Sequence, residues 1–202
     1  MSTIVGAATP LAAGGRMTVD EFERIDESLD GPFELIDGKL IRKPDMDPPH
    51  VWSTERLRKR LERMLPEGWT VRDDKPLRIP DFNERRPDIA VVRGDEDTYK
   101  RVHPKPDDVM LLIEVSVSTL YRDQSEKRHV YASSNIPVYW IVNALKQQVE
   151  VYTDPGPDGY ATCEVVKPGK SVRVVIDGKE VGQIAVDDFM PEPEPAADGD
   201  GA

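Results

Sequence analysis

Apolar positions at helical spacing predict two amphipathic helices in the N-terminal part of the chain. In "TVDEFERIDESL", Thr18 stands three residues before Glu21, which is the pattern of a capping box at a helix start. A second helix is predicted over residues 49–65, where apolar residues recur on one side of the helix. The apolar face of the first helix would consist of Phe22, Ile25 and Leu29.

Short apolar runs between turn residues predict strands. In "FELIDGKLIR", Asp37 and Gly38 separate two such runs, as in a hairpin with a tight type I′ turn. A two-residue loop would pair Glu34 with Ile41. Further strands are predicted in "TVRDDKPLRI" and "PDIAVVRG".

A continuous apolar run predicts the centre of the sheet. The segment "DVMLLIEVSV" has no polar alternation, which is typical of a strand buried on both faces. Ser118 or Thr119 could cap a following helix in "LYRDQSEKRHVYASS", and strands follow in "VYWIVN", "QVEVYT", "ATCEVV" and "VRVVI". The order of elements predicts an α/β (α+β) protein with a mixed central β-sheet flanked by helices.

Length and composition favour one globular domain. The chain has 202 residues, of which 38% are hydrophobic and 32% charged, and this suits a globular protein with one core. We expect a flexible N-terminus at 1–16, a single domain at 17–190 and a disordered acidic tail at 191–202. The chain lacks an apolar run of about 20 residues and a basic start before its first apolar stretch, so we expect a cytoplasmic protein without a membrane segment.

The net charge limits how the protein could bind nucleic acid. At a formal charge of −11, contact with phosphates would need a local basic patch. One candidate is the outer face of the second helix; the alternative is an ordinary solvated face. Cys163 is the only cysteine, which excludes an internal disulfide and a thiolate metal cluster, and we expect it to be buried. The basic face would consist of Arg56, Lys59, Arg60 and Arg63.

Glu114 is the candidate for chemistry because it interrupts the most apolar strand. A buried carboxylate needs a raised pKa, a basic partner or a cation. Asp88 begins the neighbouring apolar run, so the two acids could project into one site that suits Mg²⁺ or Mn²⁺. A structural ion pair is the alternative for both acids.

Lys127 adds a cation to this pair of acids. It follows Glu114 by thirteen residues, and its flexible stem could bring the ammonium back over the end of the strand. In phosphodiester hydrolysis, such a lysine offsets charge that develops on phosphorus. The alternative is an exposed ion pair with Asp123 at spacing i, i+4.

The ordered motifs "RRPDIAVV", "LLIEVSVSTLYRDQSEKRHVYASSNIPVYWIVN" and "VEVY" resemble the Uma-two family of restriction-endonuclease-like PD-(D/E)XK nucleases. The resemblance implies a restriction-endonuclease-like core and Mg²⁺-dependent cleavage of nucleic acid. By position, Asp88 matches the aspartate of the PD motif and Glu114 the second acid. Ser116 stands where a lysine is usual, and Lys127 matches the lysine's place in this branch of nucleases.

The same resemblance suggests further site residues. Glu34 matches an acid of the early hairpin and could assist at the metal. His50 matches a histidine before the second helix, with a surface or capping role as the alternative. Tyr131 matches a tyrosine near the site, although half-buried packing is also possible for it. Apart from the resemblance, Ser116 could orient Glu114 or a metal-bound water, with an ordinary small strand residue as the alternative.

Three functions remain open at this level. The first is a metal-dependent endonuclease in which Asp88 and Glu114 hold Mg²⁺ (or Mn²⁺). Lys127 and Glu34 would be further catalytic residues, and the substrate would be nucleic acid, with DNA favoured. The second is a non-catalytic nucleic-acid-binding or assembly module. The third is a purely structural ion pair between Glu114 and Lys127. Strand edges in the C-terminal half suggest a homodimer.

Overall fold

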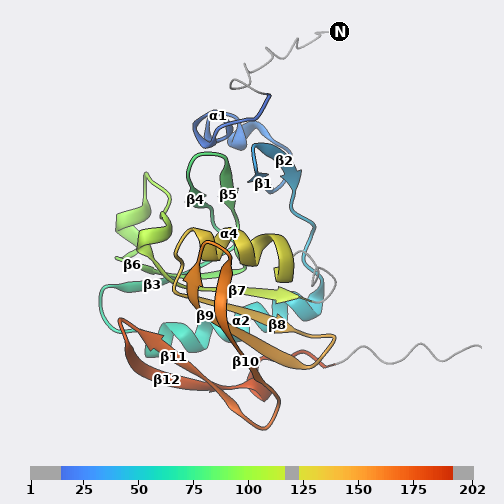
Figure 1. Ribbon diagram of the computed structural model, residues 1–202, viewed down its shortest axis with the longest axis vertical. Helices are drawn as coiled ribbons and strands as arrows, with labels where there is room; N and C mark the ends of the chain where they lie inside the picture. Colours follow the sequence, from blue (N-terminus) through green and yellow to red (C-terminus); the bar gives the residue numbers. More distant parts are fainter. Residues whose placement is uncertain (1–14, 117–122, 193–202) are drawn as a thin grey trace, which may run out of the picture.

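The central element is a six-stranded mixed sheet with the strand order β10-β9-β8-β7-β6-β3 (Figure 1). The computed structural model describes residues 15–116 and 123–192. Strands β7 and β8 are parallel and the other neighbours are antiparallel. The strands are β3 (Trp69–Asp73), β6 (Ile89–Arg93), β7 (Val109–Ser116), β8 (Val138–Asn143), β9 (Gln148–Gly156) and β10 (Gly159–Val166). The predicted mixed sheet is confirmed, with the apolar run of β7 among its inner strands.

Different elements cover the two faces of this sheet. Helix α2 (Pro48–Met64) and the hairpin of β11 (Ser171–Ile176) and β12 (Lys179–Ala185) pack on one face. Helix α4 (Arg128–Ser133) packs on the other face through Tyr131. Successive side chains of a strand point to opposite faces, so Tyr139 and Trp140 enter different cores. The inner strands are apolar on both faces because both faces are covered.

A second, four-stranded sheet with the order β2-β1-β5-β4 lies beside the central one (Figure 1). The predicted hairpin is confirmed: Asp37 and Gly38 both have positive φ, and Glu34 pairs with Ile41. Helix α1 (Val19–Glu23) packs on this sheet through Phe22. The strands are β1 (Phe33–Ile36), β2 (Lys39–Arg42), β4 (Leu77–Ile79) and β5 (Asn83–Arg85).

Several elements differ from the sequence-based prediction. The capping box of Thr18 is present, but α1 ends at Glu23, and a short 3-10 turn (Asp26–Ser28) replaces the rest of the expected helix. Strands β5 and β12 carry no strong apolar alternation and were not predicted from the sequence. The expected caps Ser118 and Thr119 lie outside the described residues.

One expectation about burial is wrong. Cys163 is exposed, because it lies on β10, an edge strand whose residues are largely open to solvent. The expected domain limits and the expected disordered tail from Pro191 stay predictions. Pro191 is buried, and its carbonyl accepts a hydrogen bond of 2.8 Å from Nε2 of Gln147.

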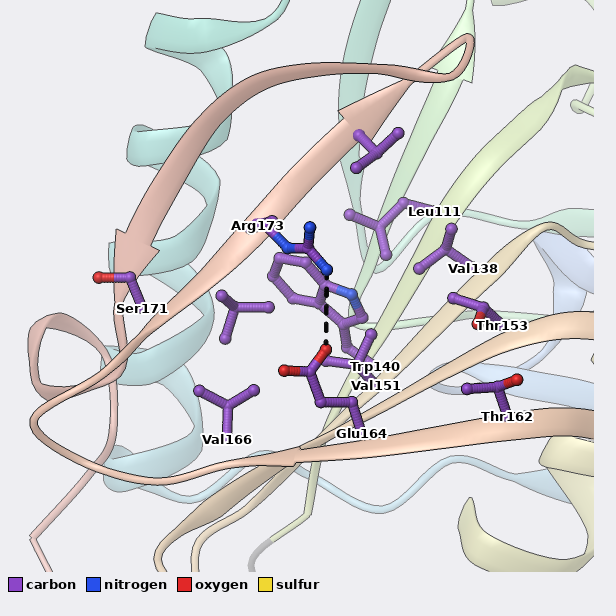
Figure 2. A pocket seen from close by; sticks show the side chains of 12 residues that line it. Leu111, Val138, Trp140, Val151, Thr153, Thr162, Glu164, Val166, Ser171 and Arg173 are labelled. Atoms are coloured by element: carbon purple, nitrogen blue, oxygen red, sulfur yellow. Dashed lines mark ion pairs between the residues drawn. The ribbon is translucent and has the colours of Figure 1, made fainter.

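An apolar cleft of about 310 Å³ lies between the central sheet and β11 (Figure 2). Trp140 and Leu111 line it, and Arg173 faces Glu164 across it at 4.0 Å. Because Trp140 belongs to the core on the α2 side, this cleft opens on the face opposite to Glu114. Within the described ranges, none of the helices is long and apolar enough to span a membrane.

Candidate active site

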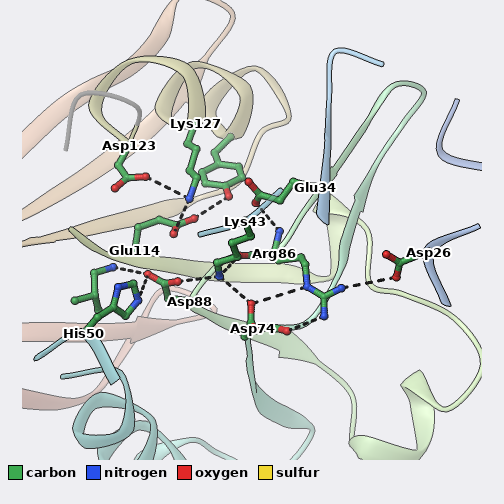
Figure 3. Close-up of polar contacts among 12 residues, drawn as sticks. Asp26, Glu34, Lys43, His50, Asp74, Arg86, Asp88, Glu114, Asp123 and Lys127 are labelled. Atoms are coloured by element: carbon green, nitrogen blue, oxygen red, sulfur yellow. Dashed lines mark hydrogen bonds and ion pairs between the residues drawn. The ribbon is translucent and has the colours of Figure 1, made fainter. Parts of the chain in front are cut away.

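Asp88 and Glu114 lie beside each other on one face of the central sheet (Figure 3). The register of β6 and β7 pairs Ile89 with Ile113, so the two acids occupy the next position of these antiparallel strands. Oδ2 of Asp88 accepts a hydrogen bond of 2.8 Å from the backbone N–H of Val115. The side chains of Asp88 and Glu114 are each 2% exposed. The structure brings the two acids together, as the sequence predicts; their chemical roles stay a prediction.

Lys127 reaches this pair of acids from the segment that connects β7 to β8. Its Nζ lies 2.9 Å from Oε2 of Glu114 and 3.2 Å from Oδ1 of Asp123. A π-helical turn (Asp123–Lys127) leads into α4 and directs the lysine toward the sheet. Both partners considered for Lys127 are therefore in contact with it, but the pair with Asp123 is buried rather than exposed.

A second lysine, which the sequence did not indicate, neutralises Asp88. Nζ of Lys43 lies 3.0 Å from Oδ1 of Asp88 and 2.8 Å from Oδ1 of Asp74. The same ammonium donates a hydrogen bond of 2.8 Å to the carbonyl of Arg86. Lys43 follows β2 and Asp74 follows β3, so only the packing of the two sheets joins them.

His50 contacts Asp88 from the first turn of α2. Its Nε2 lies 2.9 Å from Oδ2 of Asp88, an ion-pair distance at which the ring N–H is not aligned for a full hydrogen bond. The side chain of Asp47 caps the helix by accepting a hydrogen bond of 2.9 Å from the backbone of His50. This cap holds the imidazole at the acid cluster, so a purely surface position for His50 is excluded.

Glu34 and Tyr131 complete the surroundings of Glu114. The hydroxyl of Tyr131 donates a hydrogen bond of 3.0 Å to Oε1 of Glu114, while its ring packs edge-on against Tyr139. Tyr131 therefore packs in the core with its ring and contacts Glu114 with its hydroxyl. Oε1 of Glu34 accepts a hydrogen bond of 2.9 Å from the backbone N–H of Arg86. Ser116 is buried, and its hydroxyl has no hydrogen-bond partner within the described part of the chain.

Burial and neighbouring charges move the pKa values of the two acids in opposite directions. Burial alone would raise the pKa of Asp88, but His50 and Lys43 outweigh it and hold the pKa well below the ordinary value. Burial raises the pKa of Glu114; the charge of Lys127 opposes this rise, and the charge of Asp88 adds to it. Asp88 is therefore the more readily ionised of the two acids.

A buried guanidinium lies near this cluster. Arg85 is 1% exposed, and its Nε and Nη1 have no hydrogen-bond partner among the described residues. It lines an open pocket of about 600 Å³ together with Lys39 and His129. The positive charge of Arg85 lowers the pKa of Tyr131, which burial raises overall. Sequence reasoning missed Arg85, because only the fold shows that this strand residue is buried without an ionic partner.

The predicted basic face of α2 lies away from the acids. Helix α2 packs on the opposite face of the sheet, and only its first turn reaches Asp88. Two of the four residues pair with acids: Lys59 lies 2.8 Å from Glu55, and Arg60 lies 3.0 Å from Asp188. Arg56 donates a hydrogen bond to the backbone carbonyl of Asp188. Arg63 is exposed. These contacts are those of a solvated helix face, and a nucleic-acid role for it stays a prediction.

Gln124 connects the segment before α4 to the central sheet. It is half-buried, and its amide donates hydrogen bonds of 2.9 and 2.7 Å to the carboxylate of Glu150 on β9. Gln124 belongs to the π-helical turn that precedes α4. His129, in α4, is exposed.

A mixed sheet that gathers two acids and a lysine on one face, beside a small second sheet, defines a nuclease-like protein of restriction-endonuclease-like fold. Residues 19–179 match the model of the Uma2 (Uma-two) family, described as "Putative restriction endonuclease", and the chain belongs to this family. A crystal structure of "a putative nuclease belonging to DUF820" from Anabaena variabilis has a similar fold. The TM-score is 0.65 at 18% identity, covering 86% of this chain and 97% of the other. No protein of curated function matches the sequence.

Proposed function

We propose that this chain is a metal-dependent endonuclease that hydrolyses phosphodiester bonds of nucleic acid, with DNA as the first substrate to test. The observation that best supports this proposal is the position of Lys127, whose ammonium lies 2.9 Å from Glu114. Asp88 lies beside Glu114, at the start of the adjacent strand. Two acids and a lysine on one sheet face match the needs of phosphodiester hydrolysis, where a cation and a positive side chain stabilise developing negative charge.

Asp88 and Glu114 would hold the metal, which we expect to be Mg²⁺ or Mn²⁺. Their donor set consists of carboxylate oxygens, which these hard cations prefer. The buried position of Glu114 supports this fit, because a divalent cation would relieve the cost of a carboxylate charge in an apolar strand. When bound, the cation would polarise the phosphodiester and ease deprotonation of a water.

The other residues of the cluster have supporting parts in this proposal. Lys127 would stabilise the charge that develops on phosphorus, and Glu34 would orient water or metal. Tyr131 would hold Oε1 of Glu114 in place through its hydroxyl. His50 would hold Asp88 from the start of α2. The buried Ser116 hydroxyl, which lacks a hydrogen-bond partner among the described residues, would orient a water.

Arg85 supports an anionic substrate. A buried guanidinium without a carboxylate partner is costly, and it becomes stable when an anion binds. Its position in the pocket with Lys39 and His129 offers a phosphate a place near Tyr131 and the acids. We expect Arg85 to contact a phosphate of the nucleic acid.

A cleavage assay with matched variants tests the proposal. The protein is incubated with supercoiled plasmid, single-stranded DNA and RNA in Mg²⁺ or Mn²⁺, with EDTA as the blank. We expect cleavage by the wild type that EDTA stops and that Glu114→Gln and Asp88→Asn both lose. Lys179→Gln, which changes an exposed lysine of β12 on the opposite side of the sheet, serves as the surface control. Cleavage that persists in both acid variants would contradict the assignment of the site.

The alternative is a binding or assembly module that retains the fold without catalysis. One observation favours it: Lys43 and Lys127 already neutralise Asp88 and Glu114, so the cluster could persist as a structural ion network. This alternative predicts DNA retention without cleavage and no rise in melting temperature with Mg²⁺. A cation that binds the native state raises that temperature in the proposed enzyme.

We also infer the wider organisation of the protein. One hydrophobic core contains residues of both sheets, which supports a single domain over residues 17–190. The exposed edge strand β10 supports a homodimer. Light scattering during size-exclusion chromatography measures the dimer, and limited proteolysis the domain limits. We expect the protein to act in the cytoplasm, where its nucleic acid would be available.

A further inference from the structure

A second cluster of potential metal ligands lies outside the acid cluster. It consists of Glu23 from α1, Glu84 from β5 and His103 from the loop between β6 and β7. One ligand atom of each side chain lies within 4.8 Å of the other two. The three residues come from segments far apart in sequence, so the fold alone gathers them.

Glu84 is buried there without a hydrogen-bond partner for one of its oxygens. The residue is 1% exposed, and within the described ranges its Oε2 contacts no donor. Nδ1 of His103 is likewise buried and has no partner there. A buried carboxylate oxygen and a buried imidazole nitrogen without partners are costly unless a ligand satisfies them, and both belong to residues of this cluster.

This cluster is separate from the candidate active site. Glu84 pairs with Leu35 and therefore shares its face with the core of Leu35 and Phe22 under α1. The neighbouring residues on the two strands, Glu34 and Arg85, point to the other side, toward Tyr131. The second sheet thus carries different chemistry on its two faces.

We propose that Glu23, Glu84 and His103 bind a Zn²⁺ ion, with water as a fourth ligand. Zinc accepts imidazole nitrogen and carboxylate oxygen at about 2.0–2.2 Å, and three protein ligands with an open position make a common zinc set. Ligand atoms of a tetrahedral zinc lie about 3.4 Å from one another, so ligand atoms that are now within 4.8 Å would have to approach by up to about 1.4 Å through side-chain rotation. The nitrogen ligand disfavours Mg²⁺, which prefers oxygen.

The charges around the cluster are compatible with a divalent cation. Nη1 of Arg78 lies 2.8 Å from Oε2 of Glu23, so this carboxylate would be shared between the guanidinium and the metal. The charges of Glu23 and Asp26 act on Glu84, and the only cation that acts on it with them is Arg86, so the cluster carries more negative than positive charge among the described residues.

Zinc at this position would act as a structural link. The backbone N–H of Arg78 donates a hydrogen bond of 2.9 Å to the carbonyl of Pro104, and that of Val19 one of 3.0 Å to the carbonyl of Asp81. These two bonds already bring the His103 loop and α1 against the β4–β5 hairpin, which Figure 1 shows beneath α1. The ion would therefore stabilise the second sheet, independently of any nuclease activity.

Metal content and thermal stability test the proposal. The full chain is stripped with a chelator, dialysed, and titrated with Zn²⁺ alone while metal content and melting temperature are measured. We expect one tightly bound zinc and a rise of about 5–10 °C at a hundredfold excess over Kd. The rise should disappear in Glu84→Gln and in His103→Ala. It should persist in His129→Ala, which removes an exposed histidine.

A double variant, Asp88→Asn with Glu114→Gln, separates this site from the acid cluster. The zinc response should survive in it. If Zn²⁺ no longer raises the melting temperature of the double variant but still raises that of His103→Ala, the zinc binds at the acid cluster, and the proposal is overturned. If Zn²⁺ leaves the wild-type melting temperature unchanged, Glu84 holds a proton rather than a metal, and the proposal fails. Glu84→Gln keeps the size of the side chain and its neutral form, so we expect this variant to fold.

Discussion

Lys43, which directly follows β2 of the second sheet, and Asp88, which directly precedes β6 of the central sheet, are joined by a buried ion pair of 3.0 Å. Asp74 shares the same ammonium at 2.8 Å. Removing one member of a buried pair leaves the other charge uncompensated, and this generally costs more than the net stabilisation that the intact pair provides. The contact therefore links the stability of the protein to the state of its candidate active site.

Lys43→Ala should destabilise the protein by about 3–5 kcal/mol, because Asp88 would remain buried without its ammonium. Urea unfolding followed by circular dichroism measures the change in the free energy of unfolding. Lys39→Ala, which removes an exposed lysine from the neighbouring strand β2, should cost less than about 0.5 kcal/mol. If Asp88 binds a metal, Mn²⁺ should restore part of the lost stability in Lys43→Ala. Equal losses for both lysines would contradict the buried pair.

Lys127→Met should lower kcat by about 10²–10³-fold, with little change in KM, if the ammonium acts mainly in the transition state. Initial rates of plasmid cleavage at several DNA concentrations separate the two constants. Lys146→Met, which removes an exposed lysine, provides the matched control. A change confined to KM would indicate that Lys127 only binds DNA. The kinetic comparison requires that the variant still unfolds cooperatively.

Tyr131→Phe should cost about 1–3 kcal/mol in unfolding free energy, because Oε1 of Glu114 loses its buried hydroxyl donor while the ring stays in place. Tyr160→Phe removes a hydroxyl that donates to the carbonyl of Ile136 and should cost about 0.5–1.5 kcal/mol. Chemical denaturation of both variants measures the difference. A Tyr131→Phe protein as stable as the wild type would mean that the hydroxyl contributes little to holding Glu114.

Glu150 should make stability depend on pH. Burial alone would raise its pKa, but hydrogen bonds from Asn143, Gln124 and Tyr152 outweigh burial and lower it. A lowered folded-state pKa stabilises the protein above the unfolded-state pKa of about 4.3, and this stabilisation is lost as pH falls through the folded-state value. Urea midpoints between about pH 3 and pH 7 measure this dependence.

Glu150→Gln should therefore be less stable than the wild type by about 1–3 kcal/mol near pH 7, since it loses hydrogen bonds to a charged acceptor. The difference should shrink as the pH falls below about 4. Glu164→Gln, an exposed acid on the neighbouring strand β10, should show no comparable trend. A constant gap between wild type and Glu150→Gln across the pH range would argue against ionisation as the source.

The local pattern of the sequence was sufficient for much of the fold. The hairpin around Asp37 and Gly38 and the capping box at Thr18 depend on neighbours within a few residues, so both could be predicted. The continuous apolar run of β7 predicted a strand covered on both faces. Strand β12 and the π-helical turn at Asp123–Lys127 depend on packing against distant segments, and no local pattern indicated them.

The sequence by itself determined that Glu114 is a carboxylate in an apolar strand, and that Asp88 and Lys127 are within reach. It could not determine what surrounds them. Lys43 and Arg85 became part of the site only through the packing of two sheets, because side chains distant in sequence meet where strand register and sheet stacking place them. Charge compensation inside a protein is a property of three-dimensional neighbours, and only the tertiary structure decided which cations offset which acids.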